Sequence, residues 1–300
     1  MWIVRLGFVI ICKLILVFKH YLFVSFLILD MKLEFNNINT IYGSKIPLSQ
    51  PSFSSIQSES VNVTDLSKVP HYKPSFSGAL NRNLKIGRDM IKEFGEEFPM
   101  IKSNTKVGAF IDKHEFEPRY RMINKQLKSL EKKYSKGVGE MRDSIEDYMD
   151  FEDFDGFARY NNKQIESVKK SGYANCQDCA EITQWKLLQK GHDVHNVLFN
   201  IKNPYSGMDK VRGSHVFNVI GLNKKATLDD PSTWGHSAVV VDPLFKTVMP
   251  AREALPVYEK MFGFDPDMYE LEYYSQNLLP DKEISEIASK FKNSLNTESI

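Results

Sequence analysis

The chain has 300 residues, of which 42% are apolar and 12% aromatic, enough to form a sizeable hydrophobic core and to exclude wholesale disorder. Its 39 Lys and Arg residues nearly balance 38 Asp and Glu residues, and the net charge of +1 lacks the basic excess typical of nucleic-acid-binding proteins. The three cysteines are too few, and odd in number, for a small disulfide-stapled secreted fold.

The first segment, residues 1–30, contains an apolar stretch from 2 to 29 that is long enough to span a bilayer. Three cations interrupt it: Arg5, Lys13 and Lys19. Each cation costs roughly 2–3.5 kcal/mol near the middle of a membrane. Three interpretations stay open: translation starts at Met31, the segment is an uncleaved membrane anchor, or it is a basic amphipathic helix on a membrane surface. Membrane association through this segment therefore remains possible.

Two regions follow before the candidate site. Residues 31–79 are rich in Asn, Ser and Pro and predict a flexible leader. Residues 80–170 have a helical pattern, and one apolar stripe recurs every three or four residues at Tyr120, Ile123, Leu127, Leu130 and Tyr134. The stripe predicts a helix over 115–136, which we expect to end at Gly137 and Gly139.

The segment 171–300 begins with a pattern typical of a capped helix. Asn175 is a favourable N-cap residue, and Asp178 follows three residues later as a partial capping box. Gly191 suits the end of the helix, because glycine readily adopts the left-handed conformation that terminates many helices. The pattern therefore predicts a helix that begins at Cys176 and ends just before Gly191.

Three apolar runs after this helix, 194–201, 214–221 and 238–243, predict strands. Polar loops that contain Asn, Pro, Gly and Ser separate them. Two amphipathic patterns, 250–262 and 281–296, predict further helices. One helix followed by consecutive strands is typical of the α+β class.

The same segment contains a candidate nucleophile. Cys176 would be the first residue of its helix, beside unpaired backbone N–H groups and the positive end of the helix dipole, and both stabilise a thiolate. A nucleophile also needs a base and a group that orients the base. His215 opens the second predicted strand, and Asp242 ends the third, directly before Pro243. We therefore expect Cys176, His215 and Asp242 to form a catalytic triad.

The order of these three residues resembles that of papain-like and transglutaminase-like cysteine hydrolases, particularly the branch of bacterial toxins and effectors. The motifs of that branch are G-N-C-x-E-x-A, H-x-F-x-V-I-G and V-x-D-P-W, and the chain has ANCQDCA (174–180), HVFNVIG (215–221) and VVDPL (240–244). The departures are Ala174 for Gly, Asp178 for Glu and Leu244 for Trp. None of them removes a reacting group. The resemblance covers about residues 160–275.

The resemblance implies an α+β fold in which the helix that bears Cys176 packs on an antiparallel sheet. It also implies acyl transfer on a carboxamide or peptide bond, with Cys176 as nucleophile, His215 as proton shuttle and Asp242 as the orienting acid. The backbone N–H of Cys176 is one expected oxyanion donor. The family often takes a second donor from an upstream side-chain amide, for which Gln164 and Asn162 are the candidates. This chemistry implies no cofactor and no metal ion.

The toxin and effector branch implies a glutamine deamidase or a protease, with a host protein as its substrate. The protein would then be secreted or delivered into a host cell, whereas a membrane-anchored location stays open through residues 2–29. If an amine rather than water accepts the acyl group, the same chemistry is that of a transglutaminase.

Other interpretations of the cysteines also stay open. Cys176 and Cys179, followed by His192 and His195, nearly match the spacing of a zinc finger, which would give a non-catalytic binding module. The two cysteines at a helix start also match a thioredoxin-like redox pair. An inactive hydrolase fold would keep the core pattern without the chemistry. Cys179 by itself is expected to be a core residue, because its spacing from Ala180 and later apolar positions places it on the inner helix face.

Overall fold

The computed structural model describes residues 76–114, 124–149, 151, 153–202, 211–262 and 270–297. The expectations about residues 1–30, and nearly all of those about the leader, lie outside this part of the chain. Every described residue belongs to one unit, Lys73–Ile300. Among the described helices, none is both long and apolar enough to cross a membrane.

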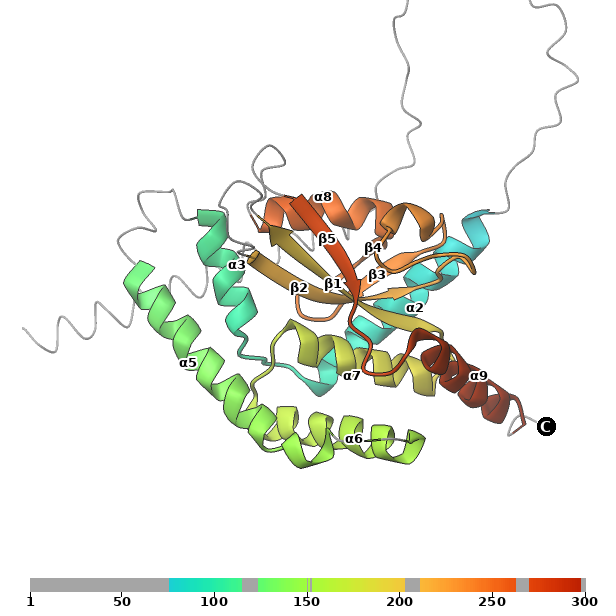
Figure 1. Cartoon of the computed structure of the whole chain (residues 1–300), viewed down its shortest axis with the longest axis horizontal. Coiled ribbons are helices and arrows are strands. Elements are labelled where there is room, and N and C mark those ends of the chain that lie inside the picture. The colour runs from blue at the N-terminus through green and yellow to red at the C-terminus, as the bar shows by residue number, and fades with distance from the viewer. Residues whose placement is uncertain are drawn as a thin grey trace, which may run out of the picture. The chain divides into compact units, whose positions relative to one another are not determined.

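The unit Lys73–Ile300 combines helices with one sheet, which confirms the α+β class (Figure 1). Its helices are α2 (Phe76–Glu97), α3 (Asn104–His114), α5 (Asn124–Asp143), α6 (Phe154–Ser171), α7 (Cys176–Gln189), α8 (Ala251–Met261) and α9 (Asp281–Thr297), with short 3-10 turns at Glu146–Tyr148 and Pro231–Thr233. Its strands are β1 (Val194–Lys202), β2 (Val211–Ile220), β3 (Val239–Asp242), β4 (Thr247–Pro250) and β5 (Glu270–Ser275).

The described strands form one five-stranded sheet in the order β4-β3-β2-β1-β5, and every neighbouring pair is antiparallel. β1 and β2 pair along almost their whole length, from Val194 opposite Ile220 to Lys202 opposite Val211. β3 pairs with β2 only over Asn218–Ile220. The earlier part of β2 therefore has a strand partner on one side only within the described residues.

Helices cover both faces of this sheet. The Asn218 side chain donates to the carbonyl of Ala180 at 2.9 Å, so this face of β2 lies against α7. Side chains alternate along a strand, so Phe217 lies on the opposite face, where its ring stacks on Tyr258 of α8 at 5.2 Å between centroids. Both faces of β2 are consequently buried, and a helix that begins at Cys176 packs on an antiparallel sheet.

The helical region also belongs to this core. α2 packs on β3 and β4, and a Cβ atom at Gly87 would come within 2.7 Å of Val248 and 2.9 Å of Val241. The expected helix end at Gly137 and Gly139 is wrong, because α5 continues through both glycines to Asp143. Gly137 faces the ring of Tyr173, which a Cβ atom would approach within 2.6 Å. Close packing, and not helix termination, accounts for this glycine.

The three expected strands and the helices after them are confirmed within a few residues, whereas β4 and β5 were not predicted. These two are the edge strands of the sheet. β4 has four residues and ends in Pro250, and β5 carries Glu270 and Glu272. Short length, proline and charge are how proteins protect sheet edges from further pairing, and the same features weaken the apolar alternation that predicts a strand.

Candidate active site

The local sequence at the start of α7 fixes the position of Cys176. Asn175 adopts an extended backbone as N-cap, and its side chain accepts from the backbone N–H of Asp178 at 3.1 Å. The Asp178 carboxylate in turn accepts from the backbone N–H of Asn175 at 2.8 Å, so the expected capping box is complete. Cys176 is therefore the first helical residue, with its own N–H at the positive end of the helix dipole.

The thiol of Cys176 lies where β3 stops pairing with β2. Two residues of β2, His215 and the backbone of Val216, both lower the pKa of the Cys176 thiol, so the thiol lies close to this part of β2. The short pairing between β2 and β3 thus gives the start of α7 access to a residue within the sheet.

His215 and Asp242 lie together beneath this opening. The Nε2 atom of His215 lies 2.7 Å from Oδ2 of Asp242, and neither side chain is exposed to solvent. Asp242 also accepts from the hydroxyl of Tyr258 at 2.8 Å and from the backbone N–H of Phe245 at 3.1 Å. Because Nε2 faces the carboxylate, Nδ1 is the ring nitrogen left for the thiol, and this buried atom has no hydrogen-bond partner among the described residues. The structure brings Cys176, His215 and Asp242 together.

The charges at this group favour a thiolate beside an imidazolium, against the effect of burial. Burial alone would raise the pKa of the Cys176 thiol, but the adjacent imidazole of His215, with smaller contributions from Val216 and Thr105, outweighs burial and lowers this pKa below its ordinary value. Burial alone would also lower the pKa of His215, but Asp242 and then Cys176 outweigh it and raise that pKa to about 9. The two groups titrate as a pair, so the charges support each other.

Aromatic rings exclude water from the histidine. The imidazole lies 5.0 Å from the ring of Phe245, 5.3 Å from Tyr258 and 5.6 Å from Phe262, measured between centroids. His215 and Asp242 are 0% exposed and Cys176 is 9% exposed, so Cys176 is the residue of the three that lies nearest to solvent.

Helix α3 supplies a residue that the sequence did not identify. The chain before α3 runs beside the chain before Cys176, since the Lys102 N–H donates to the carbonyl of Gly172 at 2.9 Å and the Lys102 carbonyl accepts from Ala174 at 3.4 Å. This pairing brings Thr105 near the thiol, where its side chain contributes to lowering the pKa of Cys176. Thr105 is 71 positions from Cys176 and belongs to no motif, so no signal in the sequence indicated it. Tyr258, within the predicted helix 250–262, was missed for the same reason.

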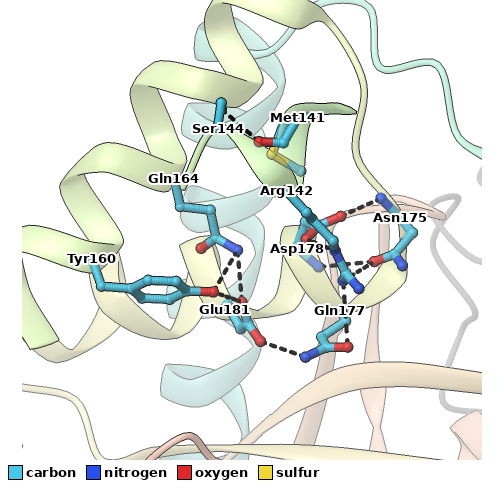
Figure 2. Close-up of polar contacts among 9 residues, drawn as sticks. All are labelled: Met141, Arg142, Ser144, Tyr160, Gln164, Asn175, Gln177, Asp178 and Glu181. Carbon is cyan, nitrogen blue, oxygen red and sulfur yellow. Dashed lines mark hydrogen bonds and ion pairs between the residues drawn. The ribbon is translucent and has the colours of Figure 1, made fainter. Parts of the chain in front are cut away.

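The two amides considered as oxyanion donors contact other groups. Gln164 is buried, and its amide donates to Glu181 at 2.6 Å and, more weakly, to Tyr160 at 3.4 Å (Figure 2). Asn162 accepts from the indole N–H of Trp185 at 3.2 Å. These hydrogen bonds involve none of Cys176, His215 and Asp242. They therefore speak against the predicted role of Gln164 as an oxyanion donor.

The zinc and redox interpretations find no support in the geometry. Cys179 is fully buried, and burial raises the pKa of its thiol well above the ordinary value. α7 has 14 residues and is about 20 Å long, so Cys176 at its start and His192 beyond its end cannot share a metal ion. His195 contacts Asp193 and Asn277. Within the described ranges, no three His, Cys, Asp or Glu side chains are grouped as metal ligands.

A cavity of about 300 Å³ lies at the end of α7 that is remote from Cys176. Its lining includes Gly191, His192, Asp193 and Lys292. The cavity is therefore separate from the candidate triad.

Comparison with known proteins adds no assignment. No protein-family model, curated protein or solved structure matches the chain. The chemistry must therefore be inferred from the geometry of Cys176, His215 and Asp242.

Proposed function

We propose that the protein is a cysteine hydrolase that acts on a carboxamide or peptide bond through Cys176, His215 and Asp242. The position of the imidazole carries the proposal, because one ring nitrogen faces the Asp242 carboxylate at 2.7 Å and the other is left for the Cys176 thiol. This is the arrangement that an activated nucleophile requires: a base in contact with it and an acid that orients the base.

The proposed reaction proceeds in two halves. The Cys176 thiolate attacks the carbonyl carbon, a C–S bond forms, and the carbonyl π electrons move to oxygen, where the N–H of Cys176 can donate to the oxyanion. The oxyanion then collapses, the C–N bond breaks, and the leaving nitrogen takes the proton of His215. A water molecule next gives its proton to His215 and attacks the thioester, which releases the acid and regenerates the thiolate. Asp242 keeps His215 oriented and balances its positive charge throughout.

The leaving nitrogen and the acceptor decide the name of the reaction. A glutamine side chain would release ammonia, whereas a peptide bond would release a new amino terminus. The resemblance of the three sequence motifs to bacterial effectors supports a glutamine deamidase or protease, acting on a host protein after secretion or delivery. An amine acceptor would make the protein a transglutaminase.

Selective alkylation tests the nucleophile without a known substrate. Purified full-length protein is treated with iodoacetamide from pH 4 to 9, and mass spectrometry follows Cys176 and Cys179 separately. We expect Cys176 to react faster below pH 7, and His215→Ala to slow it, because the imidazolium lowers the pKa of the thiol. Cys179→Ala is the matched control and should leave the reaction of Cys176 unchanged. Slow and equal reaction of both thiols would contradict the proposal.

A second assay identifies the reaction. The protein is incubated with casein, and ammonia release, new amino termini and incorporation of a labelled amine are measured. Ammonia without chain cleavage indicates a deamidase, new termini a protease, and amine incorporation a transglutaminase. Each activity should disappear in Cys176→Ala and persist in Cys179→Ala.

A further inference from the structure

Arg142, in the last turn of α5, lies against the first turn of α7 (Figure 2). Its Nε atom donates to Asp178 at 2.9 Å, and its Nη2 atom donates to Asn175 at 3.1 Å and, at a longer 3.4 Å, to Gln177. These partners occupy the positions directly before and directly after Cys176, and the position two residues after it. One guanidinium therefore holds the chain on both sides of the candidate nucleophile.

The helix start does not need this third group for capping. Asn175 and Asp178 already satisfy each other's backbone N–H groups. Arg142 adds a connection from a different helix, and a guanidinium is a rigid planar donor that fixes the orientation of its acceptors. The contact thereby ties the peptide groups around Cys176 to α5.

A buried hydrogen-bond network extends this connection by one turn of α7. Glu181 is 2% exposed and accepts from Tyr160 at 3.0 Å, from Gln164 at 2.6 Å and from Gln177 at 2.8 Å (Figure 2). The amide of Gln177 consequently bridges Arg142 and Glu181. The side chain that follows Cys176 is held at both its oxygen and its nitrogen.

The same contacts place a positive charge beside two acids near the thiol. Asp178 and Glu181 are buried on the helix that bears Cys176, and a negative charge there opposes both a thiolate and an oxyanion. Arg142 forms the ion pair with Asp178. Among the described residues, His215 on β2 and Cys179 on α7 interact electrostatically with Cys176, and Asp242 on β3 and Lys106 on α3 interact with these neighbours.

We propose that Arg142 is a positioning residue for the proposed hydrolase: by bridging Asn175, Gln177 and Asp178 it aims the backbone N–H and the thiol of Cys176. The inference rests on the proposed function. It assigns to the helical region a part in the chemistry, since α5 would orient the nucleophile that α7 carries.

Two reactions of the same thiol separate orientation from charge. Alkylation by iodoacetamide depends on the thiolate and forms no oxyanion, whereas acylation by p-nitrophenyl acetate depends on the thiolate and on the oxyanion donor. Both are measured from pH 5 to 9 on full-length protein that carries Cys179→Ala. Two variants are compared. Arg142→Met removes both the positive charge and the planar guanidinium group, whereas Arg142→Lys keeps the charge but lacks the planar group with its fixed donors.

We expect Arg142→Met to lower alkylation of Cys176 about tenfold below pH 7 and to lower acylation further. Arg142→Lys should restore most of the alkylation and its pH profile but leave acylation several-fold below that of the unsubstituted protein. The matched control is Lys186→Met, which removes an ion pair between Lys186 of α7 and Glu97 of α2. Lys186 is ten residues from Cys176 along α7, which is about 15 Å. It should lower the melting temperature and leave both pH profiles in place.

The outcomes separate this inference from the proposed function. If alkylation of Cys176 in the unsubstituted protein follows the pH profile of an ordinary thiol, the proposed function fails. If that profile is shifted to low pH, but Arg142→Met leaves alkylation and acylation unchanged, only the role of Arg142 is refuted. Equal losses in Arg142→Met and Lys186→Met would also refute it, because general destabilisation would explain both.

Discussion

Replacing Asp242 by Asn removes the charge that sustains the imidazolium while keeping the size of the side chain. The pKa of His215 is raised from 6.5 to about 9, a difference worth about 3 kcal/mol between the two protonation states. Without the carboxylate charge, burial dominates and lowers the pKa of His215, so the imidazole becomes neutral near pH 7. The Cys176 thiolate then loses its counter-charge.

The assay is the pH dependence of Cys176 alkylation by iodoacetamide in the Cys179→Ala background. In Asp242→Asn we expect the rate at pH 7 to fall roughly tenfold or more, and to rise with pH as it does for an ordinary thiol of pKa about 8.5. Each unit in the pKa of a thiol changes its thiolate fraction about tenfold below the pKa, so a tenfold loss corresponds to a rise of about one unit.

A matched control is available in a second histidine–carboxylate pair. Asp193→Asn removes the carboxylate that lies 3.2 Å from His195, outside the candidate site, and should leave the alkylation of Cys176 unchanged. An unchanged rate and pH profile in a folded Asp242→Asn protein would refute the reasoning, because Asp242 would then not determine the charge of His215.

Two further predictions concern stability. In Cys176→Ala, Asp242 still raises the pKa of His215, but by less than in the unsubstituted protein, because the contribution of Cys176 is gone. The resulting stability is fully present below pH 6.5 and is lost as the pH rises through the raised pKa, so denaturant titrations should show the free energy of unfolding falling above pH 6.5 by less than about 3 kcal/mol. A flat profile would contradict the shift. Gly87→Ala should destabilise the fold by about 1–3 kcal/mol, because its methyl group would overlap two valines of β3 and β4. Gly95→Ala, on the same helix α2, is the control: the added methyl group meets no other atom, so this variant should not be destabilised. Equal melting temperatures of the two variants would contradict the packing.

Local sequence determined the position of the candidate nucleophile, Cys176. A capping box joins residues three positions apart, so Asn175 and Asp178 predict where α7 begins without any knowledge of the rest of the fold. The apolar runs likewise predicted β1, β2 and β3, because the two faces of a sheet impose their pattern directly on the strand. His215 and Asp242 were recognisable as polar residues at the ends of apolar runs.

Distant contacts determined what surrounds those residues. Thr105, Arg142 and Tyr258 each reach the site from a helix whose sequence has only the ordinary pattern of packing faces. Nothing local distinguishes such a residue from others on the same helix, since its role depends on which element packs against it. Gln164 shows the opposite error: its sequence position suggested an oxyanion donor, but in the fold its amide donates to Glu181 and Tyr160.

The sequence by itself determined the α+β class, the start of α7 and the identity of three candidate residues, because each depends on interactions between residues close together in the chain. Only the tertiary structure decided that β2 pairs with β3 over Asn218–Ile220 alone, that the thiol lies beside the imidazole, and that residues of α3, α5 and α8 surround the site. These features depend on how separate elements pack against one another, and packing leaves no local pattern from which they can be predicted.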